Sequence, residues 1–170
     1  MEQPIFRAVE LLDMAVEIEL RGLEFYEACL ARAEHPQVKQ ALQFMAKEEA
    51  RHGEIFTRMK EGQVLYELPE SYPGEMRAYL AGFVSDKVFP SAEDHPKAMS
   101  LDDTDRVIET AIEFEKRSIL FYSAMKQVIR PSEGKIVEQV ITEEHSHIRR
   151  LLALRKDLEG SGSTADEGRG

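Results

Sequence analysis

Apolar residues recur every three or four positions along most of this chain, and this spacing predicts amphipathic α-helices. Four helices follow from it, at residues 5–33, 36–60, 103–129 and 132–158. Between the second and the third, residues 62–102 hold four of the seven prolines and a short amphipathic stretch at 75–84. We therefore expect an all-α fold, an antiparallel four-helix bundle made of two helical hairpins joined by a long crossover with a short helix.

Proline and glycine mark where these helices begin and end. Pro36 suits the first turn of the second helix, Gly62 follows its last residue, and Pro131 ends the third helix. A chain of 170 residues is long enough to bury the core of one domain. We expect residues 1–160 to form that domain and residues 161–170 to be a disordered tail.

Composition excludes several classes of function. The net charge of −10 at pH 7 argues against a nucleic-acid binder and an anionic-membrane binder, because both need a basic surface. The single cysteine, Cys29, cannot form a disulfide or a cysteine-based metal site within one chain. The N-terminus lacks the features of a signal peptide and no long apolar run could cross a membrane, so we expect a cytoplasmic protein.

Two short motifs each occur twice along the chain. They are Glu-x6-Tyr, at Glu19/Tyr26 and Glu115/Tyr122, and Glu-x-x-His, at Glu49/His52 and Glu144/His147. The copies lie at matching intervals, since 115 − 19 = 96 and 144 − 49 = 95. The two hairpins are therefore predicted to be duplicates, each contributing half of one site near a pseudo-two-fold axis.

Position on the helix distinguishes these acids from the many other acidic residues. Each motif carboxylate falls within an apolar stripe, as in the second helix, which reads Val38, Leu42, Met45, Glu49, His52, Phe56, Met59. The stripe of the first helix reads Val9, Leu12, Val16, Glu19, Leu23, Tyr26, Leu30. Four neighbouring acids lie off the stripes: Glu17, Glu48, Glu113 and Glu143. We interpret them as surface charges, with contact to the site as the alternative.

Four carboxylates that face one another in a core predict bound cations. Burying one unpaired carboxylate costs at least several kcal/mol, whereas two divalent ions would neutralise four. We expect two metal ions bound by Glu19, Glu49, His52, Glu115, Glu144 and His147. Carboxylates with one imidazole per metal favour iron (Fe2+/Fe3+), with manganese or zinc as substitutes. Tyr26 and Tyr122 are either core residues or hydrogen-bonded to a carboxylate ligand.

With these motifs the chain resembles the rubrerythrin-type diiron domain of the ferritin-like superfamily, over roughly residues 8–158. The resemblance implies that Glu49 and Glu144 bridge the metals and that His52 and His147 each bind one iron. Rubrerythrins also carry a rubredoxin domain with four cysteines, which this sequence lacks. Electrons would therefore come from a separate donor, such as a rubredoxin-like or flavin protein.

The chain departs from the family at one position of mechanistic importance. Rubrerythrins have an extra glutamate three residues after the ligand of the third helix, and here that residue is Ser118. Gly22 occupies the equivalent place in the first helix. The peroxidase mechanism of the family is therefore not expected to transfer intact.

These observations predict a non-haem diiron oxidoreductase that reduces hydrogen peroxide or dioxygen, with Tyr26 and Tyr122 as candidate catalytic residues beside the ligands. A ferroxidase or iron-handling protein is one alternative, and a non-enzymatic interaction module locked by metal is another. The resemblance and the apolar residues of the crossover also predict a homodimer.

Overall fold

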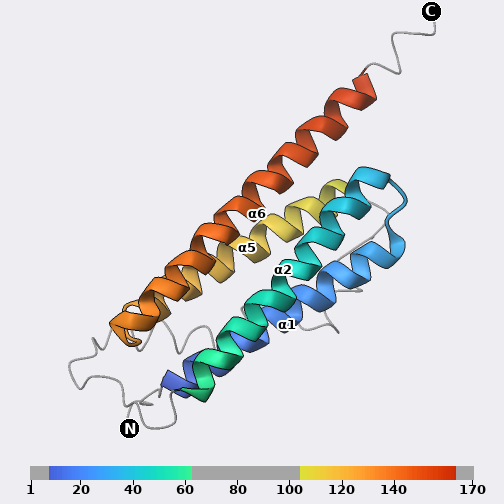
Figure 1. Cartoon of the computed structure of the whole chain (residues 1–170). Helices are drawn as coiled ribbons and strands as arrows, with labels where there is room; N and C mark the ends of the chain where they lie inside the picture. Colours follow the sequence, from blue (N-terminus) through green and yellow to red (C-terminus); the bar gives the residue numbers. More distant parts are fainter. Residues whose placement is uncertain (1–7, 63–103, 164–170) are drawn as a thin grey trace, which may run out of the picture.

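The computed structural model describes residues 8–62 and 104–163, which form four helices and no strand (Figure 1). They are α1 (Ala8–Arg32), α2 (Pro36–Glu61), α5 (Thr104–Lys126) and α6 (Pro131–Ser163). Helices α1 and α2 form one hairpin and α5 and α6 the other, while α1 also contacts α5 and α2 contacts α6. Neighbouring helices run antiparallel in Figure 1, so the predicted all-α bundle of two hairpins is confirmed.

The ends of the first hairpin follow the sequence signals. His35 adopts an extended backbone (φ −69°, ψ 126°) as the N-cap of α2, and Pro36 begins that helix. Gly62 caps its C-terminus. In Figure 1, α2 ends at one end of the bundle and α5 begins at the other. The predicted crossover between them, with its short helix at 75–84, lies outside the described residues.

The second hairpin differs from the prediction at two helix ends. Helix α5 ends at Lys126 instead of residue 129, because the chain must leave the helical conformation before Pro131. The amides of Val128 and Ile129 both donate to the carbonyl of Met125 in the resulting turn. Helix α6 begins at Pro131 and continues to Ser163, into the segment predicted as a tail. Extending an existing helix costs little compared with nucleating one.

Two hydrophobic clusters fill the bundle, one on each side of its middle. One contains Leu11, Phe56, Tyr122 and Val137 among others, and the other contains Tyr26, Leu42, Ile108 and Leu151 among others. Since each cluster draws on all four helices, both hairpins share one core. The middle of the bundle, between the clusters, is where the predicted site falls.

The predicted core face is right for α2 and partly wrong for α1. All seven predicted positions of α2 are buried. In α1, Val16, Leu23 and Leu30 are only half-buried, whereas the buried face includes Ala15, Ile18 and Phe25. Helix α1 packs against both α2 and α5, so its buried face is wider than one stripe and rotated toward α5.

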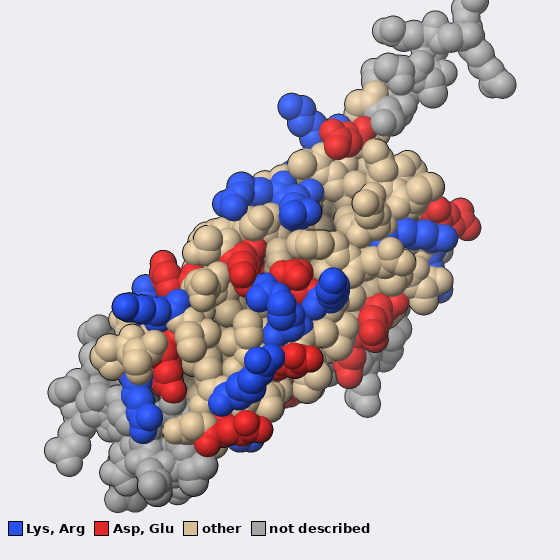
Figure 2. All heavy atoms as spheres, viewed as in Figure 1, with Lys and Arg blue, Asp and Glu red and all other residues tan. Residues whose placement is uncertain are grey.

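The surface carries both signs of charge. Figure 2 shows acidic and basic side chains intermingled on one face of the molecule. Among the described helices, none combines the length and the hydropathy that crossing a bilayer requires.

Truncating Leu11 should destabilise the protein far more than truncating Leu20 of the same helix. Leu11 is 0% exposed and Leu20 is 52% exposed, so Leu11→Ala should cost about 2–5 kcal/mol of unfolding free energy. Leu20→Ala should change it by less than about 0.5 kcal/mol. Urea denaturation of the metal-free protein measures both, and equal losses would contradict the packing of α1 described above.

Candidate metal centre

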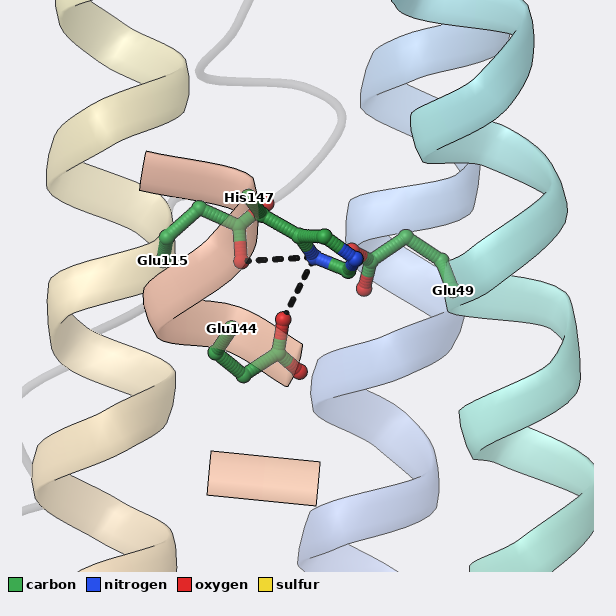
Figure 3. Close-up of side chains that lie close together, drawn as sticks. All are labelled: Glu49, Glu115, Glu144 and His147. Carbon is green, nitrogen blue, oxygen red and sulfur yellow. Dashed lines mark ion pairs between the residues drawn. The ribbon is translucent and has the colours of Figure 1, made fainter. Parts of the chain in front are cut away.

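All six predicted ligands meet at mid-length in the bundle, with one carboxylate from each helix. None is more than 2% exposed: Glu19, Glu49, His52, Glu115, Glu144 and His147. Figure 3 shows four of them, from α2, α5 and α6, pointing toward one another. The structure therefore brings together every residue that the sequence motifs selected.

Glu144 lies between the two histidines. Its Oε1 is 3.0 Å from Nδ1 of His52, and its Oε2 is 2.7 Å from Nδ1 of His147. Nδ1 of His52 is also 3.6 Å from Oε2 of Glu19, and Nδ1 of His147 is 3.6 Å from Oε2 of Glu115. The centre thus consists of two half-sites that share Glu144, and the two imidazole rings lie 5.7 Å apart.

The inward-facing atoms of this centre fit a pair of cations. Six buried atoms of the centre have no hydrogen-bond partner among the described residues: Glu19 Oε2, Glu49 Oε1, His52 Nδ1, both Glu144 oxygens and His147 Nδ1. The short His–Glu contacts bring opposite charges together without the alignment of a hydrogen bond. Buried polar atoms are normally satisfied, and oxygen and nitrogen donors that converge in this way suit a metal such as iron, manganese or zinc.

The donor atoms fall into two overlapping groups that could each hold an ion. One comprises Glu49, Glu115, Glu144 and His147, and the other comprises Glu19, His52 and Glu144. Within each group the atoms lie within 4.8 Å of one another. Glu144 belongs to both groups, which suits the bridging role that the resemblance implies for it.

Without cations, protons must balance the carboxylates. Burial, and then the charge of Glu144, raise the pKa of Glu115 to about 8. Burial also raises the pKa of Glu144, but His147 and His52 outweigh it and lower the value to about 2. Burial lowers the pKa of both histidines, yet their carboxylate neighbours raise it to about 11 for His52 and about 9 for His147. The metal-free centre therefore holds two imidazolium ions at neutral pH.

The two tyrosines tie the hairpins together through these carboxylates. The phenol of Tyr26 in α1 donates to Oε1 of Glu115 in α5, and the phenol of Tyr122 in α5 donates to Oε1 of Glu19 in α1. Burial, followed by the neighbouring carboxylates, raises the pKa of both phenols. Both therefore keep their protons and donate them, so the alternative of tyrosines without a carboxylate contact is wrong.

One contact to the site was underestimated from the sequence. Oε2 of Glu143 lies 2.8 Å from Nε2 of His52 and 2.6 Å from Nη2 of Arg51, which also contacts Glu48 at 2.7 Å. Glu143 thus holds the outer nitrogen of His52 while Nδ1 faces the centre. In the sequence, the only indication that Glu143 contacts the site is its position directly before Glu144 in α6.

Two of the other three neighbouring acids behave as predicted, whereas Glu48 is only 18% exposed and pairs with Arg51. Glu17 and Glu113 are exposed and pair with Arg21 and Lys116 on their own helices. His145 is exposed. Glu17, Glu113 and His145 lie away from the centre and take no part in it.

Gly22 occupies the closest approach between α1 and the centre. A Cβ atom there would lie 2.6 Å from Oε2 of Glu49 and 2.9 Å from Cε1 of Phe114. The equivalent residue in α5, Ser118, is buried and donates to the carbonyl of Phe114 at 3.2 Å. Any side chain at Gly22, a glutamate included, would displace the carboxylate of Glu49.

Comparison with known proteins agrees with this geometry. Residues 10–79 match the family model described as rubrerythrin, a segment that contains the first Glu-x6-Tyr and the first Glu-x-x-His. Over these residues the chain is similar to the rubrerythrin family. A search of curated protein sequences gave no significant match.

A solved structure supports the same assignment across both hairpins. The crystal structure of a protein from Thermotoga maritima, described as a ferritin-like diiron-carboxylate protein, matches with a TM-score of 0.67 at 25% sequence identity. The match covers 91% of this chain and 98% of the other. The likeness to a ferritin-like fold therefore includes the second hairpin, which the rubrerythrin family model does not reach.

Gly22→Ala should weaken metal binding, although alanine normally stabilises a helix by about 0.5–1 kcal/mol relative to glycine. The added methyl group must push Glu49 away from the centre. Gly53→Ala is the matched control, because its Cβ would meet only Cβ of Glu19 at an ordinary 3.6 Å. Melting curves with and without Zn2+ measure the effect. A metal-induced rise in melting temperature that survives Gly22→Ala unchanged would contradict this geometry.

Metal binding should release protons, because the ions replace those held by His52, His147 and Glu115. The pKa values of these groups, about 11, about 9 and about 8, lie above neutrality. Affinity for Zn2+ should therefore fall as pH is lowered from 8 to 6. Calorimetric titration with Zn2+ in buffers of different ionisation enthalpy counts the protons. Binding without proton release at pH 7 would contradict the charge balance.

Proposed function

We propose that this protein is a non-haem diiron oxidoreductase that reduces hydrogen peroxide or dioxygen with electrons from a separate donor. The observation that carries the proposal is the buried pair of histidine–carboxylate half-sites that share Glu144, within a bundle that is similar to the rubrerythrin type. A rubredoxin-like or flavin protein would suit the role of donor. We further propose a place in cytoplasmic defence against oxidative stress.

The six residues of the centre would hold two iron ions, which supply two electrons when reduced. With hydrogen peroxide, these two electrons and two protons cleave the O–O bond and give two molecules of water. The chain contributes the environment. Two hydrophobic clusters flank the centre and exclude bulk water.

Tyr26 and Tyr122 act in this proposal as positioning residues. Each phenol holds one carboxylate, Glu115 or Glu19, through a hydrogen bond from the opposite hairpin. The carboxylates are thereby fixed before metal binds, which limits the reorganisation needed during a redox cycle. Glu143 does the same for His52 from the outer side of the ring.

Protein loaded anaerobically with two Fe2+ per chain should be oxidised rapidly by hydrogen peroxide. Stopped-flow absorbance should show this oxidation, and one hydrogen peroxide should be consumed for every two Fe2+. The Glu144→Gln variant should not show rapid oxidation, because Glu144 contacts both histidines. Glu159→Gln is the matched control, since Glu159 lies on the same helix and is exposed.

The same preparation separates oxidoreductase from iron storage. After incubation with excess Fe2+ and oxidant, an oxidoreductase should retain no more than two protein-bound iron ions per chain. Binding of many more iron ions by a large particle would favour a ferroxidase. A homodimer stays a prediction, which sedimentation measures. Absence of oxidation by either oxidant would remove the proposed function.

A further inference from the structure

A pocket of about 430 Å³ lies between α1 and α2, and its lining includes two residues of the metal centre. At its floor lie the side chains of Glu19 and Glu49, which are 1% and 2% exposed. Its walls include Val16, Leu20 and Leu23 of α1, together with Gly53 of α2. These walls are apolar, so an apolar pocket several times the volume of a water molecule lies against two proposed metal ligands.

The pocket exists where α1 departs from its predicted core face. Val16 and Leu23 were expected in the core, but both are half-buried and line this pocket instead. Leu20, beside them, is 52% exposed. The rotation of α1 toward α5 therefore leaves an apolar strip of α1 facing the opening.

The duplicated hairpin differs at the residue that opens this pocket. With the offset of 95 between the Glu-x-x-His motifs, Gly53 corresponds to Ile148, since 148 − 53 = 95. Ile148 packs against the hydrophobic cluster of its end of the bundle. With the offset of 96, Val16 corresponds to Ile112, which is 5% exposed. A branched side chain thus occupies in one hairpin the position that stays open in the other.

Packing does not require a glycine at position 53. A Cβ there would make only an ordinary contact, at 3.6 Å from Cβ of Glu19, in contrast to Gly22. A glycine inside a helix costs about 0.5–1 kcal/mol relative to alanine. Because Gly53 has no side chain, the pocket stays open beside Glu19 and Glu49.

We propose that this pocket is the route by which a small uncharged oxidant, hydrogen peroxide or dioxygen, reaches the metal centre, and that Gly53 sets its width. The inference rests on the proposed function. Apolar walls admit a neutral molecule, whereas a small anion would have to give up its hydration to pass them. The rim carries the exposed ion pair of Glu54 and Arg58, at 3.1 Å, which leaves the opening hydrated.

A metal-free experiment tests the route without relying on any activity. In a Cys29→Ala background with a chelator present, Glu49→Cys places a thiol on the floor of the pocket, and Glu144→Cys places one in the α6 half of the centre. Methyl methanethiosulfonate should modify the thiol of Glu49→Cys at least about tenfold faster, because reaction follows access. Circular dichroism and urea unfolding confirm that each variant is folded.

Filling the pocket should remove that difference. Gly53→Ile, which copies Ile148, should slow modification of Glu49→Cys by about tenfold, and Gly53→Ala by much less. Gly53→Leu serves if the branched side chain prevents folding. Equal rates for the two thiols, or a rate insensitive to Gly53→Ile, would overturn the proposal. A rate that rises on dilution would also overturn it, by assigning the groove to contact with a second copy.

Iron-loaded protein separates this inference from the proposed function. Nitric oxide, a neutral diatomic probe, should bind the diferrous form more slowly in Gly53→Ile, with the iron content still two per chain. In one outcome, Gly53→Ile slows both nitric oxide binding and thiol modification while peroxide oxidises neither wild type nor variant. That result would support the proposed route and contradict the proposed oxidoreductase function. If peroxide oxidises wild type and Gly53→Ile at the same rate, the function stands and the route is wrong.

Discussion

The structure depends on keeping four carboxylates away from water at the centre of a helix bundle. Such a group is unfavourable unless cations or protons balance it. The directions of the pKa shifts show how the metal-free chain responds, since Glu115 gains proton affinity while His52 and His147 become strongly basic. An ion pair between an imidazolium and a carboxylate therefore holds each half-site in shape, and a metal ion can replace the proton of that imidazolium.

The surrounding residues follow from that constraint. Hydrogen bonds from Tyr26 and Tyr122 cross from one hairpin to the other and satisfy one oxygen on each of two carboxylates, while the remaining oxygens face the centre. Gly22 gives Glu49 the room to approach α1. Duplication of the hairpin accounts for this symmetric pair of hydrogen bonds. The tyrosine of each Glu-x6-Tyr motif donates to the glutamate of the other copy of the motif.

The sequence identifies the six Glu and His residues that the fold buries together, because a charge inside an apolar stripe is conspicuous and two motifs that each occur twice are improbable by chance. The seven-residue stripe of α2 was right throughout. The face of α1 was not, since periodicity gives the direction of a face only to within about one residue, and contact with α5 decided the rest. Glu143 was undervalued for a similar reason, because its bond to His52 depends on how α2 and α6 pack.

The roles of two glycines could not be predicted from the sequence. Gly22 and Gly53 both lie inside helices of the same hairpin, and propensity alone treats both as defects of similar size. Only the three-dimensional surroundings distinguish them, because a side chain at Gly22 would collide with Glu49, whereas one at Gly53 would extend into the pocket with only an ordinary contact to Glu19. The first glycine is required by the positions of the proposed ligands, and the second weakens the helix without any packing need. In the proposed route, the difference at Gly53 between two nearly symmetric hairpins lets a small molecule approach a centre that the bundle otherwise encloses.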